Sequence, residues 1–393
     1  MGVLLYSRLS LMMFLEFAIW GAWAPVLAAY LVGPLGLSGK KTGWIYATLW
    51  IACIISPFIG GQIADRYIAT EWFLAIVHFV GGIVLIVAAL RRSFWGLFVL
   101  MGLYSLLYAP TLALVNSLML QHLTNADAQA GGIRVWGTIG WIVAGWLLAL
   151  WRRSGKQREG MSDCLMLAGV LSLVMGVFCP FLPHTPPPEH AGNPLAFVEA
   201  IKLMAEPNFL IFLIISFVVT TELQFYYVPT APFLEDLGVK NKNVPAVMTV
   251  AQIAEIFGMF LLLPYLLPRI GYRWTLAIGV IAWPLRYIVF AIMRPLWLVV
   301  SSLGLHGIGY TFFFFAGQLY VGKVAPPEIQ ASAQALLAVV TLGFGNFIGT
   351  QFTGFIMDVF KTEEGAFRWR PIFLVPCVLT IICAFAFLAL FRG

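Results

Sequence analysis

The chain has 393 residues, of which 61% are hydrophobic and only 10% are charged. A soluble domain of this composition could not cover its apolar surface, so the sequence predicts a polytopic membrane protein. The net charge of +6 is carried by basic residues in short loops between apolar stretches, which favours topology determinants over a nucleic-acid-binding patch. The five cysteines lie scattered in apolar segments, and we expect them to be core residues, neither metal ligands nor disulfides.

Apolar stretches of about twenty residues, long enough to cross a bilayer as helices, recur along the chain. In the first half we expect helices at residues 9–32, 42–64, 72–90, 94–121, 132–151 and 163–182. The first stretch is too long for the core of a cleaved signal peptide. A polar, proline-rich stretch at 184–193 and a short amphipathic piece at 197–204 follow. In the second half we expect helices at residues 208–234, 244–268, 273–293, 295–323, 328–360 and 369–391.

The predicted pattern is six spans, a polar linker and six more spans. It corresponds to an all-α membrane protein with an N-terminal half of residues 1–183, a cytoplasmic linker of 184–207 and a C-terminal half of 208–393. Two six-helix halves are the architecture of the major facilitator superfamily, whose substrate sites lie near the bilayer midplane between the halves. We therefore expect transport by alternating access around a central site.

A motif between the second and third predicted spans resembles a loop signature of the same superfamily. The run from Gly61 to Tyr67 fits the pattern Gly-x-x-x-Asp-Arg, in which Gly61, Asp65 and Arg66 are the matching positions. The resemblance implies a part in conformational change. The alternative is an ordinary charged turn at a helix end.

The basic residues conflict with this resemblance over orientation. The loops opposite the termini hold fourteen Lys and Arg residues, and the loops on the termini's side hold seven. Because basic residues are enriched on the cytoplasmic side, the count alone predicts that the termini lie outside. The resemblance implies cytoplasmic termini, and we adopt that orientation as the expectation.

Polar side chains inside the predicted spans are candidates for function, because the bilayer interior offers no water to satisfy them. The polar residues are Glu16, Arg134, Thr138, Glu222, Gln224, Gln252, Glu255, Arg286 and His306, and the aromatic residues among them are Trp20, Trp23, Trp141, Tyr226, Tyr227 and Tyr310. For any one of them, the alternative is a packing contact or an interhelical hydrogen bond.

Three pairs of these residues share a helix face, at a spacing of three or four. They are Arg134 with Thr138, Gln252 with Glu255, and His306 with Tyr310. If the three faces meet at one cavity, they present a guanidinium, a carboxylate, an amide, hydroxyls and flat rings. This set suits a small, uncharged, polyhydroxylated ligand with a planar portion, because carboxylate and amide groups bind hydroxyls and aromatic rings stack.

Several segments, taken in order, resemble the nucleoside:proton symporter family of the same superfamily. They are residues 110–116, 133–140 and 222–224, and residues 331–334 followed by 343–345. The similarity extends from Trp20 to Phe387, nearly the whole chain. It implies a nucleoside carrier of the bacterial cytoplasmic membrane, driven by the proton gradient without a cofactor, and commonly monomeric.

Carried over by position, the family's substrate-binding residues fall on Arg134, Thr138, Trp141, Gln224, Tyr227, Gln252, Glu255, His306 and Tyr310. The resemblance implies that Gln252, Glu255 and Arg134 bind ribose hydroxyls or base edges, while the aromatic residues frame the base. Tyr227, His306 and Trp141 differ from the asparagine, tyrosine and phenylalanine of relatives, which leaves the choice between purine and pyrimidine open. Thr311 stands where relatives are acidic, and Glu16 where they carry glutamine.

A proton symporter needs a buried carboxylate whose protonation depends on its exposure to the cavity. The candidates are Glu255, Glu16 and Glu222. Glu255 is preferred because it lies among the ligand residues, and Glu16 is second because it could compensate for Thr311. Arg134 near such a carboxylate would promote proton release. We expect Arg286 to tie the ninth span to neighbouring carbonyl groups.

Other functions stay open at this stage. The chain could be a nucleoside uniporter, a major facilitator carrier for a sugar or a drug, or a membrane receptor that binds without transport. The sequence carries no motif for nucleotide hydrolysis, for metal binding or for a nucleophile beside a base, so enzyme activity is not expected.

Overall fold

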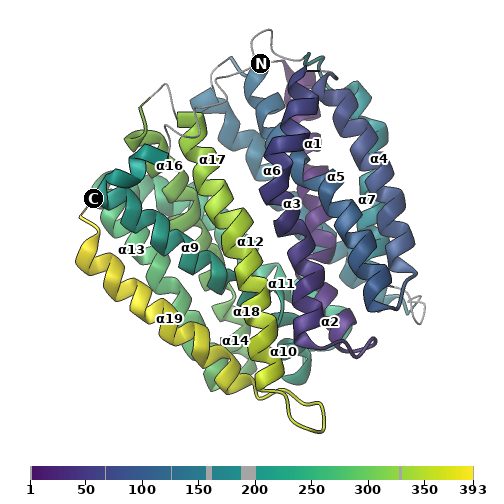
Figure 1. Ribbon diagram of the computed structural model, residues 1–393, viewed down its shortest axis with the longest axis vertical. Coiled ribbons are helices and arrows are strands. Elements are labelled where there is room, and N and C mark those ends of the chain that lie inside the picture. The colour runs from purple at the N-terminus through teal and green to yellow at the C-terminus, as the bar shows by residue number, and fades with distance from the viewer. Residues whose placement is uncertain are drawn as a thin grey trace. The chain divides into compact units, whose positions relative to one another are not determined.

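The structure is a computed structural model that describes residues 2–66, 68–124, 126–155, 162–186, 201–326 and 330–392. Within these ranges, the side chains of residues 56–66, 126–128 and 330–332 are not described. Helices make up nearly all of the described chain (Figure 1). The exception to the helical pattern is an isolated antiparallel bridge between Lys361 and Phe367, in the loop before the last helix.

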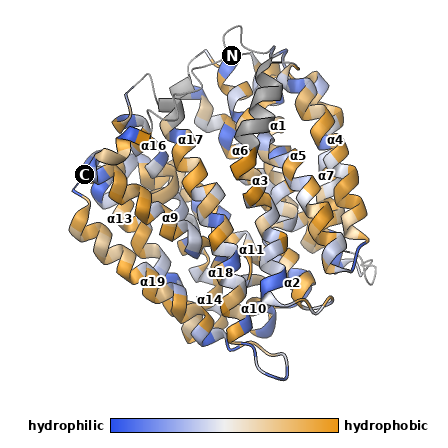
Figure 2. Ribbon diagram, viewed as in Figure 1, coloured by the Kyte–Doolittle hydropathy of each residue, from blue (hydrophilic) through white to orange (hydrophobic). Residues whose placement is uncertain are grey.

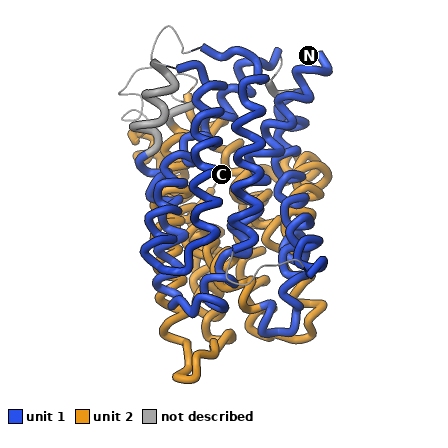
Figure 3. The backbone as a smooth tube through the Cα atoms, turned by 90° about the vertical axis from the view of Figure 1, so that its right-hand side faces the viewer, with its two compact units in different colours: residues 1–191, 234–249 blue, residues 192–233, 250–393 orange. Residues whose placement is uncertain are grey.

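The chain folds into two compact units, which Figure 3 colours separately. Unit 1 comprises residues 1–191 and 234–249, and unit 2 comprises residues 192–233 and 250–393. Residues 234–249 follow the seventh predicted span in sequence but pack with unit 1. The halves predicted from the sequence, residues 1–183 and 208–393, differ from this grouping in that segment, and the predicted linker 184–207 is divided between the units. The predicted division into two moving halves stays a prediction.

Unit 1 is built from long α-helices. In chain order they are α1 (Val3–Trp23), α2 (Leu27–Val32), α3 (Gly39–Arg66), α4 (Thr70–Ala89), α5 (Phe94–Gln121), α6 (Ala126–Arg153), α7 (Asp163–Phe178) and η1 (Cys179–Phe181). The added segment contributes the end of α10 (Thr230–Asp236), η3 (Asn241–Asn243) and α11 (Val244–Met248). The expected helix 9–32 is divided between α1 and α2 at Pro25, whose ring and missing N–H interrupt helical hydrogen bonding.

Unit 2 contains more interrupted helices. They are η2 (Leu203–Ala205), α9 (Pro207–Tyr227), α12 (Val250–Phe257), η4 (Gly258–Leu262), α13 (Leu263–Ile292), α14 (Leu296–Ser302), α15 (Gly304–Gly309), η5 (Tyr310–Phe315), α16 (Ala316–Val324), α17 (Gln330–Ala338), η7 (Val339–Gly345), α18 (Asn346–Val359) and α19 (Trp369–Leu390). Three segments, η4, η5 and η7, are π-helical turns within longer helices. Within α13, Gly271 has φ 72° and marks a kink between two consecutive helical segments.

The helices account for the twelve predicted spans. Ten stretches of the described chain are long and apolar enough to cross a bilayer. One of them, Asn241–Ile292, has 52 residues and is long enough for two spans. The helix α3 supplies the remaining one. Figure 2 shows the predominance of hydrophobic residues along the helices, and large apolar side chains such as Trp95 and Phe385 point outward, as expected for a protein surrounded by lipid.

Close helix packing in unit 1 depends on small residues. The main pairs of packed helices are α1 with α6, α4 with α7, and α3 with α5. At Gly140 of α6, a Cβ atom would overlap the carbonyl oxygen of Phe14 on α1. At Gly169 of α7, it would lie 2.9 Å from the carbonyl oxygen of Gly82 on α4. These glycines let the backbones approach more closely than any side chain would allow.

Candidate substrate and proton sites

In unit 1, the predicted binding residues lie along one face of α6. Arg134, Thr138 and Trp141 follow each other at intervals of four and three, so they stack along the helix. The Arg134 guanidinium donates a hydrogen bond to Asn116 Oδ1 on α5 at 2.9 Å, and the Asn116 amide donates to the Leu112 carbonyl oxygen at 2.7 Å. Arg134 is thus held by a neutral amide, which leaves its positive charge uncompensated by this contact.

Aromatic rings extend this face. Trp141 packs edge-on against Trp20 of α1, with ring centroids 5.5 Å apart. Trp20 also meets Trp50 of α3 at 5.8 Å and Tyr108 of α5 at 6.5 Å. Such a cluster offers flat apolar surfaces of the kind on which a heterocyclic base can stack.

Glu16 lies on α1 one helical turn before Trp20, in the interior of unit 1, with 0% of its surface exposed. Its Oε1 accepts a hydrogen bond from Thr111 at 2.7 Å, and its Oε2 lies 3.0 Å from Nε2 of His78 on α4. The His78 backbone carbonyl in turn accepts from Ser172 of α7 at 2.8 Å. Glu16 Oε1 is therefore hydrogen-bonded, whereas Oε2 lies at ion-pair distance from His78 without forming a hydrogen bond within the described chain. His78 is a neighbour that the sequence analysis missed.

In unit 2, four of the predicted residues gather around the contact of α12 with α15. Gln252 and Glu255 lie on α12 and are nearly buried, His306 lies on α15, and Tyr310 begins η5. Gly307 makes this contact possible, because a Cβ there would overlap the backbone of α12 at Ala251 and Glu255.

Two tyrosines of α9 complete this group. The Tyr226 hydroxyl is hydrogen-bonded with the Gln252 side chain, and Glu255 lies within electrostatic reach of Tyr226 and Tyr227. Tyr227 is also within reach of Tyr310. Unit 2 therefore brings an amide, a carboxylate and phenol hydroxyls together, the groups that the sequence analysis assigned to a polyhydroxylated ligand.

His306 is enclosed by aromatic rings and fixed by an arginine. Tyr226 stacks on its ring with centroids 3.8 Å apart, and Trp283 of α13 meets it edge-on at 5.3 Å. An Nη atom of Arg286 lies 2.9 Å from Nδ1 of His306. Because an arginine side chain only donates, Nδ1 must accept, so His306 is neutral and carries its proton on Nε2.

Arg286 has partners other than the carbonyl groups expected from the sequence, and that expectation was wrong. Besides His306, its guanidinium donates to the Tyr287 hydroxyl at 2.8 Å, and this hydroxyl donates to the backbone carbonyl of Glu222 on α9 at 2.6 Å. The Glu222 side chain is fully buried, and neither carboxylate oxygen has a hydrogen-bond partner within the described chain.

Two further predicted residues make contacts that tie helices together. Gln224 is fully buried on α9, and its amide donates to Asn346 Oδ1 of α18 at 2.6 Å. The Thr311 hydroxyl donates to the Glu255 backbone carbonyl at 3.3 Å, which connects η5 to α12. Asn346, like His78 and Asn116, was not singled out from the sequence. A polar residue inside an apolar run was the available signal for all three.

Comparison with known proteins identifies the chain's relatives. The family model described as "Nucleoside H+ symporter" matches residues 3–393. The chain belongs to this family. A putative nucleoside transporter of Escherichia coli, YegT, is 33% identical over 98% of this chain and 93% of its own length. The nucleoside permease NupG of the same organism is 30% identical over 98% of this chain and 95% of its own.

A crystal structure of NupG has the same fold as this symporter-family chain. It superposes with a TM-score of 0.87 at 29% sequence identity, covering 99% of both chains. The predicted resemblance and the all-α major facilitator fold are thereby confirmed. The relatives are transporters, which confirms that the chain is not an enzyme.

The loop motif predicted from the sequence falls on residues whose side chains the structure does not describe. Gly61, Asp65 and Arg66 belong to the end of α3, where the backbone is helical but the side chains lie outside the described part.

Among the residues that the structure describes, no group of three or more His, Cys, Asp or Glu side chains is placed to hold a metal ion.

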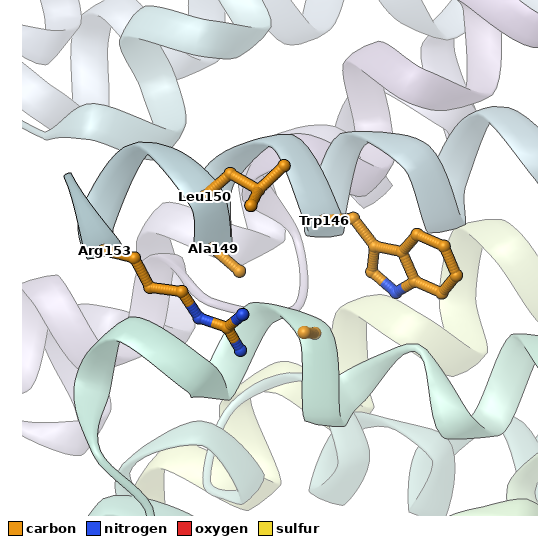
Figure 4. Close-up of a pocket in the computed structure, with 5 residues that line it drawn as sticks. Trp146, Ala149, Leu150 and Arg153 are labelled. Carbon is orange, nitrogen blue, oxygen red and sulfur yellow. The ribbon is translucent and has the colours of Figure 1, made fainter.

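A second polar region of unit 1 lies where α6 meets the segment 234–249. Arg152 forms a two-point ion pair with Asp163 at 2.7 and 2.8 Å, and Arg153 donates to Asn243 Oδ1 at 2.9 Å. Trp146 donates to the Thr249 hydroxyl at 3.0 Å. A cavity of about 250 Å³ adjoins these contacts, and Figure 4 shows Arg153 reaching from the end of α6 toward the neighbouring helix. The cavity is lined by Trp146, Ala149, Leu150, Arg153 and Ala246, none of which was predicted to bind substrate.

Proposed function

We propose that the chain imports nucleosides together with protons across a bacterial cytoplasmic membrane, by alternating access, with its termini in the cytoplasm and as a monomer. The match to the nucleoside symporter family over residues 3–393 is the observation that carries this proposal. The inward proton gradient is the energy source, and no cofactor takes part.

In this proposal the unit 2 group of Gln252, Glu255, His306 and Tyr310, with Tyr227 and Gln224 of α9, binds the nucleoside. Glu255 accepts hydrogen bonds from ribose hydroxyls, because a carboxylate offers only acceptors and a diol offers donors. Gln252 can supply both a donor and an acceptor. Support comes from the shared environment of these groups with Tyr226 and Tyr227.

In unit 1 we propose that Arg134, Thr138 and Trp141 also bind substrate. Arg134 is already anchored by Asn116, so its remaining donors are presented in a fixed orientation. The half-buried Thr138 and the nearly buried Trp141 lie along the same helix face. Trp141 offers a ring for stacking on the base, where it would contribute about 1–3 kcal/mol.

Radiolabelled uridine and adenosine uptake into proteoliposomes tests the transport proposal. With an inward proton gradient, we expect accumulation above the external concentration, and without it only equilibration. Equal uptake under both conditions would remove the proton-symport claim and favour a nucleoside uniporter. If neither nucleoside is transported or competes for binding, a carrier for another polar solute replaces the proposal, and binding without flux indicates a receptor.

The binding role of Glu255 is tested separately by nucleoside counterflow, which needs no gradient. Loss of a hydrogen bond to a charged group costs about 1.5–3 kcal/mol, so Glu255→Gln should raise KM by roughly tenfold or more. The matched control is Glu363→Gln, which changes an exposed loop carboxylate in the same way. A KM for Glu255→Gln equal to that of the control would remove Glu255 from the binding site.

A further inference from the structure

Glu222 differs from Glu16, the other fully buried glutamate, in that neither of its carboxylate oxygens has a hydrogen-bond partner within the described chain. It lies on α9 with 0% of its surface exposed, and neither Oε1 nor Oε2 has a hydrogen-bond partner within the described chain. An ionised carboxylate in such a place costs several kcal/mol, whereas the neutral acid costs much less. The surroundings of Glu222 therefore favour the neutral, protonated acid over the ionised form.

A counter-ion for the ionised form is close by. The Arg286 guanidinium lies within electrostatic reach of Glu222, and Tyr287 bridges the two residues through the Glu222 backbone carbonyl. The Nε atom of Arg286 is buried and has no hydrogen-bond partner among the described residues. Arg286 therefore retains a donor that could bind a carboxylate.

Arg286 can also exist without a carboxylate partner. Its guanidinium lies over the rings of Tyr287 at 4.6 Å, Trp283 at 4.9 Å and Tyr226 at 5.6 Å. A desolvated cation is attracted to the faces of such rings more strongly than a hydrated one. This aromatic enclosure stabilises the cation while Glu222 is neutral, so Arg286 has two alternative environments within a single unit.

The same guanidinium fixes His306, one of the residues proposed to bind the nucleoside. Its hydrogen bond to Nδ1 places the proton of His306 on Nε2. Tyr226 stacks on the imidazole and lies one helical turn after Glu222, so the carboxylate, the guanidinium and the imidazole belong to one connected group on α9, α13 and α15.

We propose that Glu222 carries the symported proton and that Arg286 couples it to substrate binding through His306. This assignment rests on the proposed function. The proton from the outer side binds the Glu222 carboxylate and gives the neutral acid, and Arg286 then holds His306 in the orientation that binds nucleoside. When the proton leaves to the inner side, the carboxylate becomes the partner of Arg286, and the hydrogen bond from Arg286 to His306 breaks.

Among the residues that the structure describes, the other titratable groups around Glu222 do not provide a cationic partner for the ionised form. Tyr287 of α13 and Cys383 of α19 lie within electrostatic reach of the carboxylate, and neither is a cation. The helix α18, which also packs on α9, presents the neutral Asn346 to Gln224. Around Arg286, the facing titratable groups are His306, Tyr226, Tyr227 and Tyr287.

Glu222→Gln, which mimics the protonated acid, tests the proposal in proteoliposomes containing the full chain. We expect nucleoside counterflow within about twofold of wild type and loss of accumulation driven by the proton gradient. The matched control, Glu364→Gln, changes an exposed carboxylate and should accumulate nucleoside like wild type. If Glu222→Gln accumulates nucleoside like this control, Glu222 is not the proton carrier.

A second measurement does not depend on accumulation. In weakly buffered detergent solution, at a pH high enough to ionise Glu222 in the substrate-free protein, adding uridine or adenosine to wild-type protein should cause proton uptake, detected by a pH-sensitive dye, and Glu222→Gln should show none. Proton uptake by the variant equal to that of wild type would overturn the assignment. Failure of the wild type to accumulate nucleoside would instead overturn the proposed function, so the two failures are distinguishable.

Discussion

The two units each bury a glutamate inside a helical bundle, but they treat its carboxylate differently. In unit 1, Glu16 accepts from Thr111 and lies 3.0 Å from His78. In unit 2, Glu222 has no partner for either oxygen within the described chain, and the nearby Arg286 is bonded to His306. Burial is the same in both cases, so burial alone does not identify a proton carrier. The difference lies in whether the ionised form already has its partners.

The helices of the two units also differ in their regularity. The helices that enclose Glu16 are regular α-helices, with close approaches such as that of α1 and α6 at Gly140. Unit 2 contains the π-helical turns η4, η5 and η7, two of which directly follow the helices that carry Glu255 and His306. Because π-helical turns occur frequently at functional sites, this contrast favours unit 2 as the adaptable part of the substrate and proton machinery.

The largest effect on stability is expected for Glu16→Ala. The substitution removes the acceptor of Thr111 and the ion-pair neighbour of His78 from a fully buried site. Breaking a buried pair by removing one member costs about 3–5 kcal/mol. The free energy of unfolding, measured by denaturant titration in detergent, should fall by this amount. A change of less than about 1 kcal/mol would mean that Glu16 is as weakly bound as Glu222 and would remove the contrast between them.

A smaller effect is expected for Gly307→Ala, which separates α15 from α12. Overpacking costs about 1–3 kcal/mol, and the higher helix propensity of alanine offsets about 1 kcal/mol of it. Because α15 carries His306 and α12 carries Glu255, the KM of nucleoside counterflow should rise as well. Gly169→Ala in unit 1 is the matched control, with a similar steric conflict between α7 and α4. It should lower stability without changing KM. An equal rise of KM in both variants would show a general packing effect.

The spans could be predicted from the sequence because their hydrophobicity is local. The expected span 94–121 coincides with α5. The π-helical turns could not be predicted, because they depend on how one helix accommodates its neighbours. The predicted boundary between the spans 244–268 and 273–293 is confirmed, because the helix α13 is interrupted at Gly271, where φ is 72°.

For the candidate sites, spacing identified residues but not their partners. The pair Gln252 and Glu255 was evident because a spacing of three places two polar groups on one helix face. The partner of Glu16 was missed, because a lone His78 in an apolar run carries no information about which helix it faces. The role of Arg286 was misjudged for the same reason, since its contact with His306 joins two helices that the sequence does not relate.

The third prediction concerns Glu222→Gln as a test of stability. If the acid is neutral in the folded protein, glutamine replaces it without loss of a hydrogen bond, and the free energy of unfolding should change by about 0.5 kcal/mol or less at neutral pH. Denaturant titration in detergent measures this change beside that of Glu16→Ala. A loss of about 3 kcal/mol or more would indicate that Glu222 is ionised and has a strong partner, which would place it in the same class as Glu16.

The smallest effect is expected for Glu235, a half-buried carboxylate near the end of α10 that provides an intermediate case. Burial raises the pKa of Glu235 above its ordinary value, although the hydrogen bond from Asn241 and the charge of Arg152 oppose this effect. Because the folded-state pKa exceeds the unfolded one, the folded state binds the proton more tightly. Its contribution to stability is present below the unfolded pKa and is lost as pH rises through the folded pKa.

The unfolding temperature of wild type relative to Glu235→Gln should therefore decline modestly as pH rises from about 4 to about 7, since glutamate ordinarily titrates near 4.3. Thermal scans in detergent, with the exposed Glu363→Gln as control, measure this difference. A difference that grows with pH would show that Arg152 and Asn241 outweigh burial. Glu235 would then resemble Glu16 in having partners close to its carboxylate, and Glu222 would stand apart because it lacks hydrogen-bond partners within the described chain, not because of its burial.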